Sequence, residues 1–510
     1  MAKSRKTPSL IGIDLGTSSV KVLLCDLLGN ILARQSVEYP TYQTNPGWFE
    51  QDPRDWWDAA ASAVGHLVSG FGRSIEILSI GLSGQMHGTL LLGSDRQPLY
   101  PAIIWRDLRS SVQVDQIHQL VGRSRLIKIS GNLVAAGFQA ATIRWIQQNA
   151  PDIWDRTGHV LLPKDYLQLQ MTGELASDPS DGSGTTLFDI HKRNWSSEQL
   201  NLLGINNALL PPIQPSISVP GELTPNAAEA FSLRPGIPVV TGAADTACAM
   251  LSAGIVDPKK LLINISTGGQ VVLPSREVEF DMQGRSHTFC SALEPQSGQA
   301  GWYRMGATLS AGGSLQWLRD NLLELSGKDA YPQMTALAAT SPPGANRLIF
   351  QPYLAGERTP HMDPAARGSF IGLTLHHRNS DLVRAVMEGV VFSLHEAFLT
   401  LRSATIQPDS TILAGGGSRS RLWQQIVADV FNLPVTPLMI GEQSALGAAI
   451  LAGLGMQLIS LEQVPKSWAR YGDTIEPDPR NISLYASLFD LFQKAYLNLQ
   501  ETFRHLSKID

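Results

Sequence analysis

Two short segments, about half a chain apart, have the same construction. IGIDLGTSSVK at residues 11–21 and LINISTGGQVV at residues 262–272 each read as an apolar strand, a turn of Gly with Ser or Thr, and a second apolar strand. Glycine lets the backbone approach a ligand closely, and turn amides with hydroxyls form a concave set of donors that suits phosphate oxygens. Two such hairpins in one chain indicate a duplicated fold that holds a nucleotide between its halves.

Length, charge and cysteine content exclude several classes of protein. A chain of 510 residues is too long for one hydrophobic core, so we expect at least two domains. The net charge of −5 gives no electrostatic footprint for nucleic acid or for an acidic membrane. Three cysteines without paired spacing favour a reducing compartment, and no apolar run is long enough to span a bilayer. We expect a cytoplasmic protein without a nucleic-acid or membrane partner.

Strand-like and helix-like stretches alternate along most of the chain, which favours α/β layers. In the first half, an irregular basic tail at 1–9 precedes the first hairpin. A strand at 75–82 follows, and later a short buried strand at 238–242 that leads into a helix at 246–252.

The second half begins near Lys260, with the second hairpin. A strand at 411–414, a helix at about 422–431 and a helix rich in Ala and Gly at 444–453 come later. The small faces of that last helix permit close packing against backbone or ligand. A final helix docked on the surface is then predicted by apolar residues at helical spacing: Leu484, Leu488, Leu491, Phe492, Ala495 and Leu499. We place the domain boundaries at 10–254, 260–454 and, for a helical tail, 455–510.

Polar side chains lie where several strands are expected to end. Asp14 on the first strand either supports a magnesium-bound water or caps the turn. Asp245 is either a helix N-cap or a carboxylate at the carboxyl end of a strand, the edge where α/β sheets place their chemistry. Gln85, Met86 and His87 end another strand; the three groups would suit a polyol, although a lone His there is usually structural.

Other signals are weaker. Four tryptophans could stack on a sugar face, although core packing is their commoner role: Trp48, Trp56, Trp57 and Trp105. The segment DPSDGSG at 178–184 faintly resembles a calcium loop, but its spacing does not fit an EF-hand, so we predict a solvated turn. Neither a P-loop nor a dinucleotide-binding glycine motif is present.

Together these motifs resemble the FGGY family of carbohydrate kinases from about Leu10 to Leu454. GIDLGTS at 12–18 is similar to the family's first phosphate loop, PGWFEQDP at 46–53 to its amino half and GSFIGL at 368–373 to its carboxyl half. SGQMHG at 83–88 most resembles the members that phosphorylate D-xylulose.

The resemblance implies two α/β domains of the actin-like (ribonuclease H-like) ATPase fold, with a cleft between them. It implies transfer of phosphate from ATP, with Mg²⁺, to a small-molecule sugar, D-xylulose. The alternatives are a kinase for another polyol, such as ribulose or gluconate, and a non-catalytic ATP-binding member; the Gln-Met-His stretch argues against the first and Asp245 against the second. A homodimer stays open.

The resemblance also implies roles for single residues. Asp245 matches the catalytic base, and Asp14 matches the Asp that supports magnesium and phosphate. Sugar contacts are expected from Met86 and His87 with their neighbours Gln85, Trp105 and Asp107. Nucleotide contacts are expected from Thr17, Ser18, Lys21, Thr267, Gly268, Gly312, Gln316, Gly416 and Ser420.

Two stretches depart from the pattern of the D-xylulose branch. GAADT at 242–246 stands where GGGDN is usual, and ISTGG at 265–269 stands where LGTSG is usual. Ala244 and Thr246 flank the expected base, so the choice of sugar is more open than the reaction.

Overall fold

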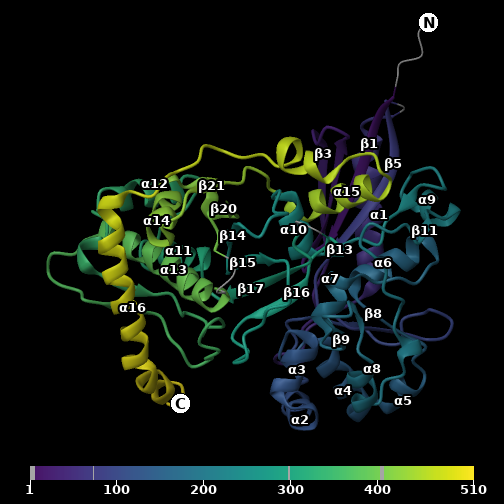
Figure 1. Cartoon of the computed structure of the whole chain (residues 1–510), viewed down its shortest axis with the longest axis horizontal. Coiled ribbons are helices and arrows are strands. Elements are labelled where there is room, and N and C mark those ends of the chain that lie inside the picture. Colours follow the sequence, from purple (N-terminus) through teal and green to yellow (C-terminus); the bar gives the residue numbers. More distant parts are fainter. Residues whose placement is uncertain (1–5, 73, 297–298, 403–406, 510) are drawn as a thin grey trace, which may run out of the picture.

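The computed structural model describes residues 6–72, 74–296, 299–402 and 407–509. Each half of the chain contains a mixed β-sheet with helices packed around it (Figure 1). The α/β class expected from the sequence is therefore confirmed. Within the described ranges, no helix is long and apolar enough to cross a membrane.

The first sheet has the strand order β11-β12-β5-β1-β2-β3, and β13 also pairs with β5. Its strands are β1 (Thr7–Leu15), β2 (Ser19–Asp26), β3 (Ile31–Glu38), β5 (Ile75–Gly84), β11 (Gly221–Glu222), β12 (Pro238–Val239) and β13 (Ala243–Ala244). The hairpin of β1 and β2 is antiparallel as predicted, and β5 joins β1 in parallel. Because residues 7–9 already pair with residues 75–77, the tail predicted at 1–9 is wrong for these three residues, while residues 1–5 lie outside the described part.

The second sheet has the order β16-β17-β15-β14-β20-β21. Its strands are β14 (Lys260–Ile265), β15 (Gly269–Ser275), β16 (His287–Cys290), β17 (Trp302–Thr308), β20 (Ser410–Ala414) and β21 (Val435–Pro437). Strand β14 forms an antiparallel hairpin with β15. On its other side it pairs in parallel with β20, just as β1 pairs in parallel with β5. The run β3-β2-β1-β5-β12 thus has its equivalent in β17-β15-β14-β20-β21, and the duplication predicted from the two hairpins is confirmed.

Helices pack around both sheets (Figure 1). Those of the first half are α1 (Pro53–Ser69), α6 (Pro163–Thr172), α7 (Pro179–Gly182), α9 (Pro225–Ala230) and α10 (Asp245–Ser252). The first half also contains a group with its own apolar core, α2 (Ser111–Val121), α3 (Arg123–Ser130), α4 (Gln139–Asn149), α5 (Pro151–Asp155) and α8 (Ser197–Leu203). Those of the second half are α11 (Gly312–Asn321), α12 (Ala330–Ala339), α13 (Asn379–Leu401), α14 (Arg421–Phe431), α15 (Gln443–Gly455) and α16 (Pro479–Leu506).

The predicted final helix exists as α16, which lies along the outer side of the second half (Figure 1). Its buried face is formed by Tyr485, Leu488, Phe492, Tyr496 and Phe503, which join the core around α13. Leu484 and Leu491, which the sequence also assigned to that face, are exposed, because aromatic residues occupy the contact instead.

Helix α15 belongs by sequence to the second half, yet it packs on β1 and β5 of the first sheet and on α10 (Figure 1). Gly12 on β1 and Gly81 on β5 face the helix so closely that a Cβ atom would overlap the carbonyl oxygens of Ala445 and Ala448. Gly447 meets the carbonyl of Cys248 on α10 in the same way. The close packing predicted for the Ala- and Gly-rich helix is therefore confirmed, and its partner is backbone. One apolar core spans both halves of the chain at this contact.

This contact predicts the effect of adding one methyl group. Gly81→Ala should lower the thermal unfolding midpoint clearly, because its Cβ cannot coexist with the Ala448 carbonyl, and overpacking costs about 1–3 kcal/mol or more. Gly70→Ala is the matched control, because Gly70 ends α1 at φ −70° with no atom within 4 Å of the added carbon. Equal midpoints for the two variants would show that α15 is not in backbone contact with β5.

Candidate active site

Two carboxylates meet at one edge of the first sheet. Strands β1 and β13 both run parallel to β5, and Asp14 and Ala243 pair with Ser83 from its two sides. Asp245 follows two residues after Ala243, as the first residue of α10. The carboxyl ends of these strands therefore bring Asp14 and Asp245 close together.

Burial changes the acid–base properties of both groups. Burial, followed by the charge of Asp245, raises the pKa of Asp14 to about 7, against the opposing effect of Lys21. Burial also raises the pKa of Asp245, against hydrogen bonds to its Oδ1 from the Thr246 amide (2.5 Å) and hydroxyl (3.2 Å). Oδ1 of Asp14 is buried and has no hydrogen-bond partner in the part of the chain described. An orphaned acceptor beside a second carboxylate suits a cation or its bound water.

The second half reaches this carboxylate pair through the start of α15. The Ser444 hydroxyl donates to the main-chain carbonyl of Asp245 at 3.1 Å. Glu442 lies 3.6 Å from Lys21, which sits opposite Asp14 in the β1–β2 hairpin. The packing of α15 thus determines where the second half stands relative to the carboxylates.

The first turn, with Thr17 and the exposed Ser18, is held from several sides. Gln51 donates to the Thr17 carbonyl at 2.6 Å, and the Trp105 indole N–H donates to the Thr17 hydroxyl at 3.0 Å. Gln85 donates to Gln51 at 2.9 Å. The amide nitrogen of Gln85, which was expected to contact sugar, is committed to Gln51, whereas its Oε1 is buried and accepts no hydrogen bond from the described residues.

His87 is held as a neutral ring. Its Nδ1 lies 2.6 Å from the Gly184 carbonyl, and because a carbonyl only accepts, Nδ1 carries the proton. The ring stacks on Phe138 with a centroid distance of 3.9 Å, and burial lowers the pKa of His87 to about 4. A Cβ on Gly184 would stand 3.0 Å from the Met86 methyl, so Met86 and His87 both line this turn.

The second half also supplies side chains beside His87. Phe289 on β16 lies 6.1 Å from the His87 ring, and His287 stacks on Phe289 at 5.6 Å. His287 Nδ1 contacts Oδ1 of Asn132 at 3.1 Å, and burial lowers the pKa of His287 to about 3. These residues have no counterpart in the expected site, which placed every sugar contact in the first half.

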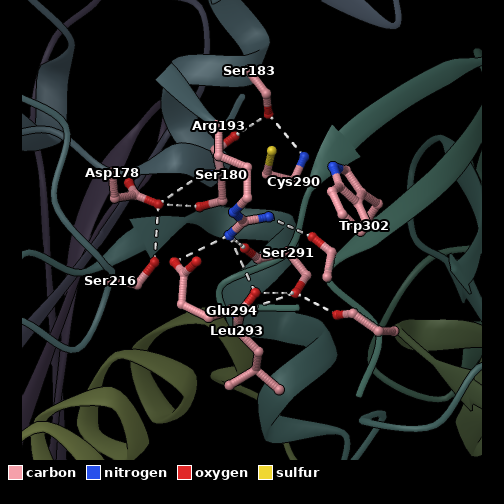
Figure 2. A network of polar contacts seen from close by, with 12 residues as sticks. Asp178, Ser180, Ser183, Arg193, Ser216, Cys290, Ser291, Leu293, Glu294 and Trp302 are labelled. Carbon is pink, nitrogen blue, oxygen red and sulfur yellow. Dashed lines mark hydrogen bonds and ion pairs between the residues drawn. The ribbon is translucent and has the colours of Figure 1, made fainter. Parts of the chain in front are cut away.

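A polar network fastens the hairpin of β16 and β17 to the first half (Figure 2). The Arg193 guanidinium donates to the Gly301 carbonyl at 2.7 Å and pairs with Glu294 at 3.3 Å. The Ser183 hydroxyl accepts from the Cys290 amide at 3.0 Å. The hairpin that carries His287 and Phe289 is therefore anchored, and its position beside His87 is set by main-chain contacts.

The segment at 178–184 is not the solvated turn predicted from the sequence. Asp178 and Asp181 are fully buried. Lys164, also buried, lies 2.7 Å from Asp165 and 3.3 Å from Asp178, and Ser180 donates to Asp178. The buried lysine offsets the charge that would otherwise keep this acidic segment in water.

The residues expected at the nucleotide converge at the carboxyl ends of β14 and β20. Thr267 and Gly268 form the turn after β14, and the amide of Gly312, which begins α11, donates to Ser266 in that turn at 2.7 Å. Gly416 is exposed in the loop after β20, next to Gly415, whose Cβ position abuts the Ile265 carbonyl. Turn, helix start and loop thus share one edge of the second sheet.

The two remaining members of this set have defined positions. Gln316 lies on the exposed side of α11, one turn from Asp320. The Ser420 hydroxyl accepts from the Trp423 amide at 3.3 Å and so caps α14.

Asp107 has a structural role rather than the sugar contact expected of it. Its carboxylate accepts from Arg109 at 2.8 and 2.9 Å and from the Phe49 amide at 2.6 Å, and it is fully buried. With both oxygens occupied by protein donors, no acceptor is left for a ligand.

The four tryptophans have different environments. Trp56 is buried in the core against Tyr166, Trp57 packs on Phe231 and Trp48 packs on Trp145. Trp105 alone among the four contacts an expected site residue, Thr17.

Comparison with known proteins agrees with this geometry. The model for the N-terminal domain of the FGGY family of carbohydrate kinases matches residues 9–252, and the model for its C-terminal domain matches residues 267–456. The chain belongs to the FGGY family of carbohydrate kinases. It is therefore a phosphotransferase that acts on a carbohydrate, built on the two-domain actin-like ATPase fold.

The individual relatives include xylulose kinases and a gluconate kinase. The chain is 36% identical to the xylulose kinase of Bacillus subtilis, over 96% of this chain and 97% of that one. The solved xylulose kinase of Rhodospirillum rubrum superposes with a TM-score of 0.90 at 30% identity, covering 97% of this chain and 100% of that one. The solved gluconate kinase of Lactobacillus acidophilus gives 0.91 at 26% identity, covering 98% and 100%. The fold alone does not separate the two sugars.

Several residues near His87 in this FGGY kinase were not predicted from the sequence. Gly184, Asn132, His287 and Phe289 come from segments distant in sequence from His87, and the anchored hairpin brings the last two to it. The one local signal was the alternation of His287 and Phe289 on a short strand, which places both on one face.

The raised pKa of Asp14 predicts a pH-dependent gain in stability for Asp14→Asn. Because the folded pKa (about 7) exceeds the usual 3.8, ionisation costs the folded state increasingly as pH rises from about 4 to 7. Asparagine removes that cost, so the variant should exceed the parent by up to about 4 kcal/mol at pH 8 and by little near pH 4. Thermal midpoints measured between pH 4.5 and 8.5 test this.

Asp52→Asn is the control for this series. Asp52 caps α1, and its hydrogen bonds with Arg54 lower its pKa, so its charge contributes stability above its usual pKa. The control should be less stable than the parent at pH 8. A midpoint difference for Asp14→Asn that stays constant with pH would contradict the raised pKa.

Proposed function

We propose that this FGGY kinase transfers the γ-phosphoryl group of ATP to O5 of D-xylulose. The observation that carries the proposal is the pair of Asp14 and Asp245, which the carboxyl ends of neighbouring strands bring together just before the turn at Thr17. The names of the relatives with about a third of their residues identical support the choice of sugar.

Asp245 is proposed as the general base. Its Oδ1 is held by Thr246, whereas Oδ2 accepts no hydrogen bond from the described part of the chain. A sugar hydroxyl is a weak nucleophile, and a carboxylate within hydrogen-bond reach accepts its proton as O5 attacks the γ-phosphorus. The O5–P bond forms, the bond from phosphorus to the β–γ bridging oxygen breaks, and ADP leaves with that oxygen. Burial raises the pKa of Asp245 and so makes it a better proton acceptor.

The phosphates are assigned to the two turns. Thr17, Ser18 and Lys21 line the first turn, and Thr267 and Gly268 form the second. Asp14, with its unpartnered Oδ1, would hold Mg²⁺ through its bound water. When bound, the ion would neutralise charge on the phosphoryl oxygens.

Met86 and His87 are proposed to contact the sugar. With the proton on Nδ1, which is turned toward Gly184, the His87 Nε2 is an acceptor for a sugar hydroxyl. The low pKa of His87 keeps it neutral at physiological pH, so it contributes this hydrogen bond without a charge.

A kinase for another polyol is the second candidate. Ala244 and Thr246 beside Asp245 depart from the D-xylulose pattern, and the gluconate kinase of Lactobacillus acidophilus has an equally similar fold. ADP release coupled to a reporter, measured with D-xylulose, D-ribulose and D-gluconate, separates the candidates. The highest kcat/KM with D-xylulose is expected, and a higher value with either other compound would overturn the sugar assignment.

Asp245→Asn should lower sugar-dependent ADP release by about two to four orders of magnitude, the usual contribution of a general base. Asparagine still accepts from Thr246, so the sugar should bind with nearly unchanged affinity in calorimetry. Activity close to that of the parent would rule out Asp245 as the base.

His87→Ala should raise the KM for the sugar about 10-fold or more and the KM for ATP much less, since it removes one buried hydrogen bond. His191→Ala, an exposed histidine of the same half, is the control and should change neither constant. Equal increases in both KM values would indicate a structural role for His87.

The homodimer and the cytoplasmic location stay predictions from the sequence. The three cysteines, Cys25, Cys248 and Cys290, are free and buried, which agrees with a reducing compartment.

A further inference from the structure

A cationic side chain of the second half stands beside the sugar end of the site. Arg358 lies in the connection between β18 (Ile349–Gln351) and β19 (Ser369–Ile371). Its guanidinium carbon is 5.9 Å from the centre of the Trp105 ring, which belongs to the first half. Its charge also acts on His87 and His287, lowering the pKa of each. Arg358 therefore spans the two halves at the point where both contribute to the site.

The backbone on either side of Arg358 is fixed to the second sheet. Buried Glu357 accepts from the amides of Leu309 (2.9 Å) and Arg358 itself (2.6 Å). Thr359 exchanges two hydrogen bonds with Ala307 on β17, at 3.0 and 3.2 Å. Because both neighbours are anchored, the position of Arg358 is built into the fold rather than left to a free loop.

The guanidinium has no protein anion as partner. Throughout the ranges that the structure describes, no carboxylate lies within ion-pair distance of Arg358 and its side chain makes no hydrogen bond. Arg358 is exposed to water, yet the protein around it still lowers its pKa, as at the wall of a recess. An arginine whose main chain is anchored, and whose guanidinium is partly desolvated and unpaired, is suited to a bound anion.

The surroundings of Arg358 identify that anion. Trp105 connects Arg358 to Thr17 of the first phosphate turn through a hydrogen bond of 3.0 Å. The charge of Arg358 also acts on His87, the proposed sugar contact. The group that passes between a phosphate turn and a sugar hydroxyl is the phosphoryl group itself. Lys21, the nearest cation of the first turn, already faces Glu442.

We propose that Arg358 is a further catalytic residue, which donates hydrogen bonds to the non-bridging oxygens of the phosphoryl group during transfer and then to the sugar phosphate. The proposal rests on the proposed kinase function. Because Arg358 comes from the second half and its partners Trp105 and His87 from the first, this cation completes the site only when the two halves stand together.

The test compares R358Q and R358K with the parent. R358Q should lower kcat about 100-fold or more, as expected for loss of a donor that stabilises transition-state charge. R358K keeps the charge without the planar fork and should recover part of that loss. In calorimetry, R358Q should bind D-xylulose as the parent does, but bind D-xylulose 5-phosphate about tenfold more weakly.

R367Q is the matched control. Arg367 lies in the same connection, and its side chain donates to the carbonyls of Pro364 and Ala366. Its kcat and product affinity should equal those of the parent. Equal losses in R367Q and R358Q would show that the connection, not the cation of Arg358, matters.

Two other results would overturn the proposal. An unchanged kcat in R358Q would exclude a role in transfer. A weaker affinity for D-xylulose with normal affinity for the phosphorylated sugar would make Arg358 a sugar contact. If the parent prefers another sugar in the panel, the same comparison is made with that sugar and its phosphate. An error in the sugar and an error about Arg358 therefore give different results.

Discussion

The packing of α15 against the backbone of β1, β5 and α10 is the contact on which the rest of the site depends. Gly12, Gly81 and Gly447 allow main chain to meet main chain there, at distances that any larger residue would prevent. As a result, the start of α15 places Ser444 on the carbonyl of Asp245 and Glu442 beside Lys21. The second half is thus joined to the proposed base by helix α15, and the same core positions the two turns proposed to bind phosphate.

The second junction lies at the sugar end, where the anchored hairpin of β16 and β17 brings His287 and Phe289 to His87. Burial controls the charge at both junctions. It keeps the two histidines neutral and raises the pKa of the two carboxylates, while the cation of Arg358 is left without a protein partner. The site thus leaves one cation free for the group proposed to be transferred.

Local patterns predicted a large part of the fold. The two hairpins follow from apolar strands around Gly-rich turns, and α14 and α15 begin within one residue of the predicted 422 and 444. Asp245 was placed correctly at the start of a helix after a short strand. These elements could be predicted because their signals, such as periodicity, turn residues and caps, lie within a few neighbouring residues. The resemblance to FGGY kinases added the expected roles of single residues, which no local pattern contains.

The sequence by itself determined the duplicated hairpins, the family and the carboxylates at the ends of strands. Only the tertiary structure decided which polar groups are spent inside the protein. Asp107 is occupied by Arg109 and the Phe49 amide, and the acidic segment at 178–184 is buried around Lys164. It also decided that Arg358, an ordinary arginine in the sequence, stays unpaired beside Trp105. The physical reason is that the burial and pairing of a polar side chain depend on residues up to hundreds of positions away. No short stretch of sequence can therefore show whether a charged group is paired or free.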